Sequence, residues 1–247
     1  MQLAMEIPKP HLSELSALTD VDFALAHEVL EDAHYAKFYK EQRAQGRRVV
    51  LDNSMHELGT KALTVPELLE AAKKIDPSCV IAPDRLGDAK FTFESFEQLR
   101  KDPKLNWDPA IVIQGTTYED RIKLFNGVRS FTQTMCLPYR EPRLKWMTEL
   151  IIGSPAYVKF PPYLHLLGMQ DGQELVEFNK LVRQYGYPSN NVTVDTAKPI
   201  KWAMKGKKID SLETLHGGGL LDHKAKMNDV QQALTLYNIC VMRKAMA

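Results

Sequence analysis

Short apolar runs alternate along this chain with longer, helix-prone stretches. Several of the runs have the length of a buried strand, and they lead directly to Asp52, Asp84, Gln114 and Asp195. The stretches between them begin with helix-start signals and end at glycine or polar turns. Strands that alternate with helices in this way predict a parallel sheet covered by helices.

The pattern gives a position to most elements. Strands are expected at residues 22–27, 48–51, 79–82, 110–113, 131–137, 163–168 and 192–195. Helices are expected at residues 28–45, 64–74, 91–100, 118–126, 142–152, 172–185, 199–206 and 229–246. Thr64 and Glu67 form a capping box at the start of one helix. In the last helix, four apolar residues are expected to face the barrel: Val230, Leu234, Tyr237 and Val241.

The number of units favours a (β/α)8 TIM-type barrel over an open doubly wound sheet. A chain of 247 residues suits one barrel, so we expect a single domain over residues 1–247 with the helix at 229–246 packed on it. The rhythm breaks after Asp195, where residues 217–219 are three glycines and predict a flexible turn. No eighth strand is placed, so the barrel is expected to be irregular at its last unit.

Composition narrows the setting of the protein. Lys plus Arg number 32 against 31 Asp plus Glu, a formal charge of +1, so contact with a polyanion requires local clusters of charge. The three cysteines are far apart, which argues against a disulfide framework or a zinc knot. The chain shows no signal peptide and no run of about 18 apolar residues. We therefore expect a cytoplasmic protein, in the host cytoplasm if a phage encodes it, without a membrane partner.

The polar residues at strand ends indicate a site. Asp52, Asp84 and Gln114 follow one another at about thirty residues, the length of one strand and helix, and Asp195 comes later. A single Asp in this position more often caps a helix. Three carboxylates and an amide at one mouth are costly to keep for stability alone, because buried carboxylates must be desolvated and paired. The joint pattern therefore favours function.

Local motifs resemble those of tRNA-guanine transglycosylases. Residues 113–121, Ile-Gln-Gly-Thr-Thr-Tyr-Glu-Asp-Arg, resemble the family segment Val-Gln-Gly-Gly-x-Tyr-x-Asp-Leu-Arg. Residues 51–59 resemble its Ser-Asp-Ser-Gly-Gly-Phe-Gln turn, and are closer to the Asp-Asn-Gly-x-x-Glu form of phage and DNA-modifying relatives. Pro-Asp-Arg-Leu at 83–86, Leu-Leu-Gly at 166–168 and Val-Thr-Val-Asp-Thr at 192–196 follow in family order. The resemblance spans roughly residues 20 to 205.

The resemblance implies a base-exchange mechanism. Asp195 would attack C1′ of a guanosine nucleotide and form a covalent glycosyl intermediate, and Asp52 would handle protons of the leaving and entering bases. Asp84 would accept hydrogen bonds from N1–H and the amino group of guanine. Gln114 would donate to O6, with Gly115 keeping the backbone close.

Two departures from the family concern the pocket and the metal. The family uses Gly-Gly-Leu backbone amides to bind the base where this chain has Met135, Cys136 and Leu137, and the resemblance makes Cys136 and Leu137 candidates for this contact. Gly168 is expected to line the substrate site. The family's zinc motif is missing, so we expect no metal and no cofactor.

The resemblance implies two partners, nucleic acid and a free 7-deazaguanine base. The shortness of the chain favours DNA over tRNA, as in phage-type DNA-guanine transglycosylases. Five lysines after the proposed nucleophile are candidates for phosphate contacts: Lys198, Lys201, Lys205, Lys207 and Lys208. His223, Lys224 and Lys226 extend this segment. The alternatives are a tRNA-directed enzyme and a non-catalytic barrel that binds a base for a partner; the oligomeric state is open.

Other residues with functional chemistry have simpler interpretations. His27 and His56 follow strand ends, but packing or loop hydrogen bonds explain them. Glu57 is a candidate to brace the turn after Asp52. Three tryptophans are expected to fill core or interface positions: Trp107, Trp146 and Trp202.

Overall fold

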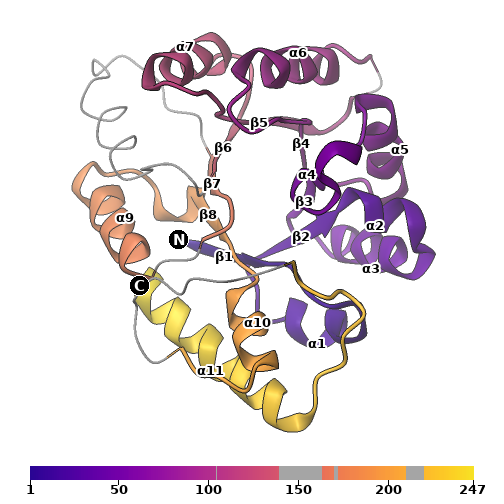
Figure 1. Cartoon of the computed structure of the whole chain (residues 1–247), viewed down its shortest axis with the longest axis vertical. Helices are drawn as coiled ribbons and strands as arrows, with labels where there is room; N and C mark the ends of the chain where they lie inside the picture. Colours follow the sequence, from indigo (N-terminus) through magenta and orange to yellow (C-terminus); the bar gives the residue numbers. More distant parts are fainter. Residues whose placement is uncertain (104, 139–162, 170–171, 210–219) are drawn as a thin grey trace. The chain divides into compact units, whose positions relative to one another are not determined.

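Eight parallel strands close a barrel in chain order (Figure 1). The computed structural model describes residues 1–103, 105–138, 163–169, 172–209 and 220–247. The strands are β1 Gln2–Met5, β2 Val21–Leu25, β3 Val49–Asp52, β4 Cys79–Ile81, β5 Asp108–Val112, β6 Thr134–Leu137, β7 Tyr163–Leu166 and β8 Val192–Asp195. The predicted (β/α)8 fold class is confirmed.

Helices follow most of the strands, and their bounds agree closely with the pattern. They are α1 Leu12–Ser16, α2 Ala26–Glu31, α3 Ala33–Ala44, α4 Met55–Leu58, α5 Val65–Ile75, α6 Ala89–Arg100, α7 Tyr118–Val128, α9 Gly172–Gln184, α10 Lys198–Met204 and α11 Asp229–Met246. The capping box of Thr64 and Glu67 at the start of α5 is confirmed. The helix expected at 28–45 is instead two helices, because Asp32 accepts hydrogen bonds from the N–H groups of His34 and Tyr35 and so starts a new helix.

The eighth strand, which the pattern left unplaced, is the first one in the chain. β1 pairs with β8 in parallel, with Leu3 opposite Val194 and Ala4 opposite Asp195. Its sequence, Gln-Leu-Ala-Met, contains good helix formers and no β-branched residue, so local propensity gives no strand signal. Burial decides its conformation, because Leu3, Ala4 and Met5 have no exposed surface.

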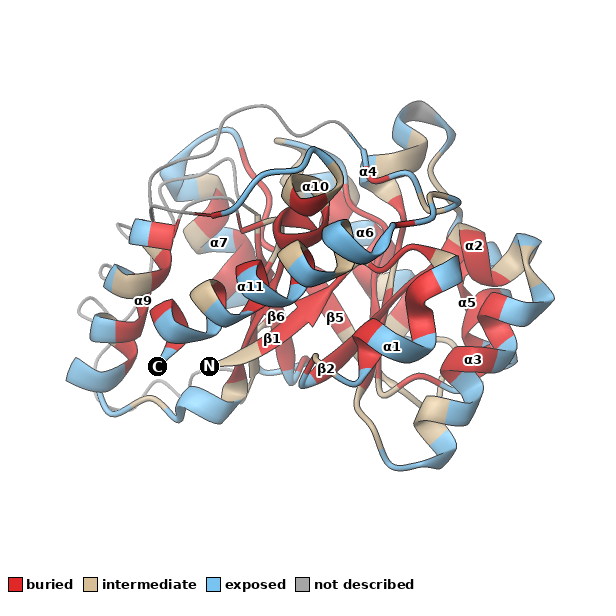
Figure 2. Ribbon diagram, turned by 90° about the horizontal axis from the view of Figure 1, so that it is seen from below, coloured by how far each residue is buried: buried red, intermediate tan, exposed pale blue. Residues whose placement is uncertain are grey.

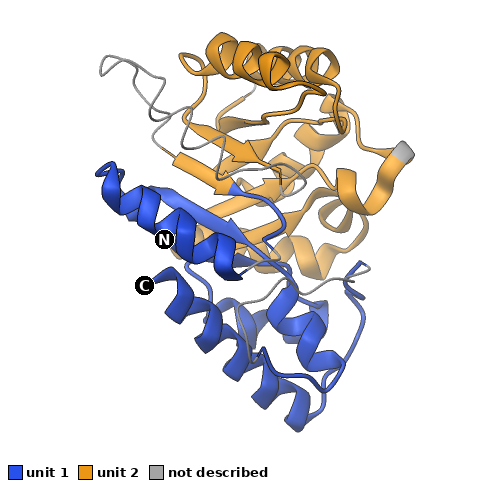
Figure 3. Ribbon diagram, turned by 60° about the vertical axis from the view of Figure 1, so that its left-hand side comes forward, with its two compact units in different colours: residues 1–20, 139–158, 166–247 blue, residues 21–138, 159–165 orange. Residues whose placement is uncertain are grey.

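The chain divides into two compact units (Figure 3). Unit 2 contains residues 21–138 and 159–165, and unit 1 the remaining segments. In unit 2, every residue of β2 is buried, and most residues of the other strands are coloured as buried in Figure 2. Two tyrosines of α3 tie this helix to β2. Tyr39 donates through its hydroxyl to Phe23 O at 3.0 Å, and the Tyr35 hydroxyl accepts from Leu25 N at 3.1 Å. These hydrogen bonds satisfy the polar atoms of two fully buried rings.

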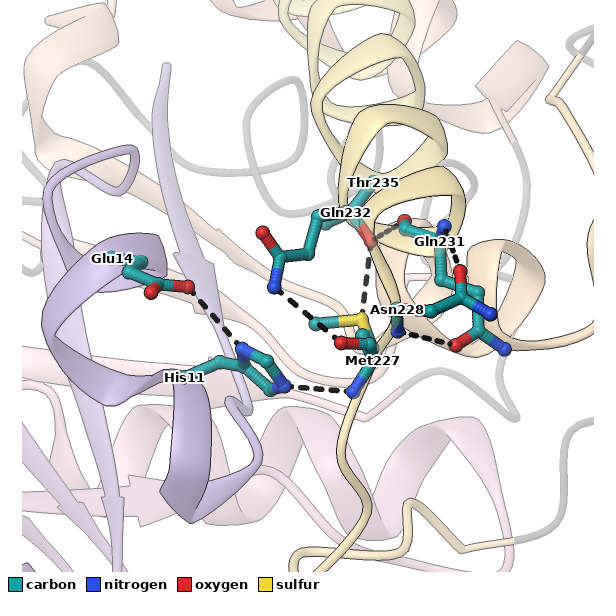
Figure 4. Close-up of polar contacts among 7 residues, drawn as sticks. All are labelled: His11, Glu14, Met227, Asn228, Gln231, Gln232 and Thr235. Carbon is teal, nitrogen blue, oxygen red and sulfur yellow. Dashed lines mark hydrogen bonds and ion pairs between the residues drawn. The ribbon is translucent and has the colours of Figure 1, made fainter.

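In unit 1, a buried histidine holds the start of α11 (Figure 4). Nε2 of His11 accepts a hydrogen bond from Met227 N at 2.8 Å, and its Nδ1 lies 3.3 Å from Oε2 of Glu14. The first contact requires an unprotonated Nε2, so Nδ1 carries the hydrogen and faces the carboxylate. Asn228 and Gln231 then form a capping box that begins the helix.

The predicted buried face of α11 is wrong at two of its four residues, because Val230 and Tyr237 are 68% and 43% exposed. Leu234 and Val241 are half-buried. The buried face contains Thr235, Asn238, Ile239, Met242, Ala245 and Met246. Asn238 is fully buried because its side chain finds three backbone partners: Oδ1 accepts from Ile209 N at 2.7 Å, and Nδ2 donates to Pro199 O at 3.0 Å and Lys207 O at 3.2 Å. A hydrophobicity pattern cannot anticipate a polar residue that is buried for its hydrogen bonds.

Two predicted elements lie outside the described residues, namely the helix at 142–152 and the glycine turn at 217–219. Within the described part of the chain, no helix is both long and apolar enough to cross a bilayer.

Replacement of Asn238 by alanine tests the polar anchor of α11. Asn238→Ala leaves two buried backbone groups, Ile209 N and Pro199 O, and the partly exposed Lys207 O without their partner. Each buried unpaired group costs about 1–3 kcal/mol, so we expect a loss of about 2–6 kcal/mol in the free energy of unfolding. Asn126→Ala, the same change at an exposed position of α7, is expected to alter it by less than about 0.5 kcal/mol. Urea denaturation measures both. Equal effects of the two changes would contradict the role of Asn238.

Candidate active site

The turn after β3 is held by its own side chains. Asp52 ends the strand, and its Oδ2 accepts a hydrogen bond from Ser54 N at 2.8 Å. Ser54 has a left-handed backbone with φ of 59°, and its hydroxyl accepts from His27 N at 3.2 Å. Asp52 is half-buried. Its carboxylate is therefore both fixed at the strand end and within reach of solvent.

Asn53 links this turn to the end of β4 through its side-chain amide. Nδ2 donates to Ala82 O at 2.7 Å and to Asp84 Oδ1 at 2.9 Å, while Oδ1 accepts from Met55 N at 2.9 Å. The β3–β4 register pairs residues 29 apart, and Asn53 and Ala82 continue this offset. The side-chain amide of Asn53 therefore forms the next cross-strand hydrogen bond, at the position where the backbones of β3 and β4 are no longer paired. Sequence reasoning missed this role of Asn53, although its place between Asp52 and Ser54 was a signal.

Asp84 is a buried carboxylate between two amides. It is 8% exposed, with Oδ1 bound to Asn53 and Oδ2 accepting from Gln114 Nε2 at 2.7 Å. Burial raises the pKa of Asp84 above its ordinary value, and the hydrogen bonds from Asn53, from Gln114 and from its own backbone oppose this shift. The carboxyl group therefore accepts hydrogen bonds in fixed directions, and these hydrogen bonds favour its ionised form against the effect of burial.

Gln114, just beyond β5, is held by a glycine loop. Its Oε1 accepts from Gly87 N at 3.1 Å, while Nε2 donates to Asp84. The orientation of the amide is determined, because a backbone N–H only donates and an ionised carboxylate only accepts. Gly87 has φ of 74°, a conformation that favours glycine. The predicted association of Asp84 with Gln114 is thus present as a direct hydrogen bond.

Gly115 has no room for a side chain. A Cβ atom there would lie 2.7 Å from Cγ of Arg121 and 2.9 Å from Cβ of Asp120. Arg121, itself buried, donates from Nε to Gly115 O at 2.9 Å. Asp120 and Thr117 form the capping box of α7. The glycine therefore lets α7 pack directly on the backbone that carries Gln114.

Cys136 and Leu137 end β6 and are buried. Burial raises the pKa of the Cys136 thiol well above its ordinary value, and the charges of Cys79, Asp52 and Asp84 add to this effect. The thiol is therefore neutral at physiological pH and not a ready nucleophile. Because the charges of Asp52 and Asp84 raise its pKa, the Cys136 thiol interacts electrostatically with both of these carboxylates of unit 2.

In unit 1, Asp195 ends β8 and is 4% exposed. Its Oδ2 accepts from Gly168 N at 3.3 Å, and its backbone carbonyl accepts from Met169 N at 2.8 Å. Thr196 fixes the same segment by donating to Met169 O at 2.8 Å. Gly168 has φ of 61°, which directs its N–H toward the carboxylate. The structure thus brings together two predicted site residues, Asp195 and Gly168.

The lysines that follow Asp195 differ in how far they are exposed to solvent. Lys198 is 8% exposed in the first turn of α10, Lys201 is half-buried, and Lys205, Lys207 and Lys208 are exposed. Two of the exposed lysines cover aromatic rings. Nζ of Lys207 lies 5.4 Å from the centre of the Trp202 ring, and Nζ of Lys208 lies 5.2 Å from that of Tyr237. Trp202 is therefore partly exposed beside lysine rather than a core residue.

The remaining candidates have local roles. His223 lies 3.8 Å from the Glu6 carboxylate, and Lys224 and Lys226 are exposed. Trp107 donates to Asp76 Oδ1 at 2.7 Å, and Trp146 lies outside the described residues. Glu57 is half-buried and His56 exposed. Among the described residues, no group of three His, Cys, Asp or Glu side chains is arranged to hold a metal.

Comparisons with known proteins show the fold alone. No protein-family model and no curated protein matches the chain. Three solved structures are similar over 98–100% of both chains. They are D-psicose 3-epimerase in the presence of D-fructose, D-psicose 3-epimerase from Clostridium cellulolyticum H10 with D-tagatose, and KGPDC from Streptococcus mutans. Their TM-scores are 0.56, 0.52 and 0.52, at 12%, 11% and 10% identity.

The close approach of α7 to Gly115 makes a paired prediction. Gly115→Ala forces its new methyl group against Arg121 and Asp120, and we expect a loss of about 1–3 kcal/mol in the free energy of unfolding. Gly127→Ala, within α7 itself, meets nothing within 4 Å, and we expect a gain of about 0.5–1 kcal/mol. Thermal and urea unfolding check both signs. A neutral Gly115→Ala variant would contradict the packing argument.

Proposed function

We propose that this protein is a guanine transglycosylase that exchanges guanine in nucleic acid, DNA rather than tRNA, for a 7-deazaguanine derivative. The observation that carries the proposal is the buried arrangement of Asn53, Asp84 and Gln114 in unit 2. The order of motifs along the chain supports it independently.

The arrangement suits the hydrogen-bonding edge of guanine. Guanine presents an acceptor at O6 beside donors at N1 and the 2-amino group. Asp84 takes the two donors when Gln114 Nε2 turns its hydrogen bond from Asp84 to O6, while Gln114 Oε1 keeps its contact with Gly87. Adenine has a donor where guanine has O6 and an acceptor at N1, so the same side chains reject it.

The chemistry uses two carboxylates at strand ends. The Asp195 carboxylate attacks C1′, a C–O bond forms, and the C1′–N9 bond breaks as guanine leaves and takes up a proton. The incoming 7-deazaguanine loses its N9 proton, attacks C1′ and releases Asp195. Asp52 is the proton carrier for both bases, a role that suits a fixed, half-buried carboxylate. No external oxidant or energy source is required.

Contact with nucleic acid is assigned to the exposed end of the lysine segment. Lys205, Lys207 and Lys208 offer positive charge for phosphates, and Trp202 offers an aromatic surface for an unpaired base. Lys198 is excluded from this role because it is buried. A base that is exchanged must leave the stack, so binding near unpaired nucleotides fits the chemistry.

Replacement of Asp195 tests the covalent mechanism. Asp195→Asn is expected to lower the exchange of labelled guanine at least about 10³-fold, since the nucleophile is lost while the shape of the side chain is kept. A protein–nucleic acid adduct that resists denaturant should form with the wild type and disappear in this variant. Asp229→Asn, at the exposed start of α11, is the matched control and should behave as wild type. Normal exchange by Asp195→Asn would exclude the mechanism.

One experiment determines whether DNA or tRNA is the nucleic-acid substrate. Nucleosides from DNA and from tRNA are analysed by mass spectrometry after incubation with the protein and a 7-deazaguanine base. We expect the modified nucleoside in DNA. Modification of tRNA alone would establish the tRNA-directed alternative, and tight binding of base without product or adduct would establish a non-catalytic barrel.

The lysine surface predicts the salt dependence of DNA binding. Lys207→Gln with Lys208→Gln removes two phosphate contacts, so the slope of log affinity against log salt should fall by about 1.4 for single strands and about 1.8 for duplex. Lys37→Gln with Lys90→Gln is the control, because these lysines are 72% and 85% exposed on other helices. Fluorescence anisotropy at several salt concentrations measures the slopes. Equal slopes for both double variants would remove Lys207 and Lys208 from the interface.

A further inference from the structure

We propose that Asn53 is a positioning residue that keeps Asp84 an anionic acceptor and thereby makes the pocket select a base with an amino rather than an oxo group at C2. The selection of a base rests on the proposed function. The action of Asn53 on Asp84 rests on geometry alone.

The two amides on Asp84 differ in how firmly they are held. Asn53 is 4% exposed, and both its amide group and its carbonyl oxygen are engaged, with Ala82 O, Asp84 and Met55 N as partners at 2.7 to 2.9 Å. Two of these partners are backbone atoms and do not depend on a ligand. Among the residues that the structure describes, the one backbone partner of the Gln114 side chain is Gly87 N, at 3.1 Å. Asn53 is therefore the permanent donor to Asp84, and Gln114 is the one that can turn to a ligand.

The permanent donor determines the charge of Asp84. A hydrogen bond donated to a carboxylate favours its ionised form, and burial of Asp84 opposes ionisation. Besides Asp84, the titratable groups whose charges act on the Cys136 thiol of β6 are Asp52 at the end of β3, Asp108 at the start of β5 and the Cys79 thiol at the start of β4. Arg85 does not offset the burial, since its guanidinium lies near Asp88 and over the Phe91 ring. Loss of the Asn53 donor therefore favours the protonated acid.

The charge of Asp84 selects the group at C2 of the base. An ionised carboxylate only accepts, so it suits the N1–H and amino N–H of guanine and repels the C2 carbonyl of xanthine. A protonated carboxyl has one donor and one acceptor, which suits the carbonyl and N1–H of xanthine. Both bases present O6 to Gln114. Guanine and xanthine thus form a matched pair of ligands that share O6 and differ in the group at C2, which faces Asp84.

Two variants separate the effect of the Asn53 hydrogen-bond donor from the effect of the size of its side chain. Asn53→Leu has a similar size and no donor, so the pKa of Asp84 should rise above that of the wild type. Asn53→Asp donates to Asp84 only while the pair holds a proton. Once the side chain at position 53 is a carboxylate, its charge disfavours a second charge on Asp84, so the pKa of Asp84 should rise above that of the wild type. Asn106→Asp, an exposed position in unit 2, controls for the added negative charge.

The experiment combines carbon-13 NMR titration of the Asp84 carboxyl with calorimetric binding of free guanine and free xanthine, at a pH where both bases are neutral. We expect Asn53→Leu to bind guanine about ten-fold or more weakly than the wild type and to lose most of its preference over xanthine. For the wild type, guanine binding should weaken as pH falls and Asp84 becomes protonated. For Asn53→Asp the same loss should begin at a higher pH, because the added carboxylate raises the pKa of Asp84, while Asn106→Asp follows the wild type.

The outcomes are distinguishable. An Asp84 titration that is identical in the wild type and in both Asn53 variants would overturn the proposal. If Asn53→Leu does not fold, the displacement of guanine binding to higher pH in Asn53→Asp decides alone, because a purely structural role of Asn53 would leave the pH dependence as in the wild type. Shifted titrations in a wild-type protein that binds no guanine would refute base exchange and retain the control of Asp84 by Asn53.

Discussion

The arrangement of the candidate site depends on the burial of one carboxylate. An ionised carboxyl group that is removed from water is stable only when donors replace its hydration. Asp84 is 8% exposed, and Asn53 and Gln114 supply these donors from beyond the ends of β3 and β5, the two strands on either side of β4. The hydrogen bonds therefore join β3, β4 and β5 beyond the point where their backbones separate.

The backbone around the site follows from this requirement. Gln114 reaches Asp84 only if its carbonyl oxygen is held on the other side, and Gly87 does so with a left-handed backbone. Gly115 then allows α7 to approach the same segment, where Arg121 donates to its carbonyl. Glycines at these two positions are needed for reasons internal to the protein. A motif that resembles a family's ligand-contacting glycine can thus be maintained by packing as well as by ligand.

Sequence reasoning succeeded where local pattern and tertiary structure agree. The strands that end at or shortly before Asp52, Asp84 and Asp195 and the capping box at Thr64 were all predicted, because their signals lie within a few adjacent residues. It failed where a distant contact decides. Leu3 and Ala4 form a strand only because β8 pairs with them. The structural roles of two asparagines were missed for the same physical reason. Asn238 is buried through three backbone partners that lie 29 to 39 residues away. The hydrogen bond from Asn53 to Asp84 joins residues 31 apart.

The fold and the site carry separate information about function. The similar barrels include two sugar epimerases, yet at 10–12% identity the three structures share only architecture with this chain. In the described part of unit 2, the strand-end groups are carboxylates and amides with fixed orientations. Side chains of this kind discriminate between donors and acceptors at the edge of a planar ligand, because a carboxylate oxygen only accepts and the nitrogen of an oriented amide only donates. The proposal of a nucleobase as ligand therefore rests on these side chains and on the motifs that carry them, and the architecture neither adds to it nor opposes it.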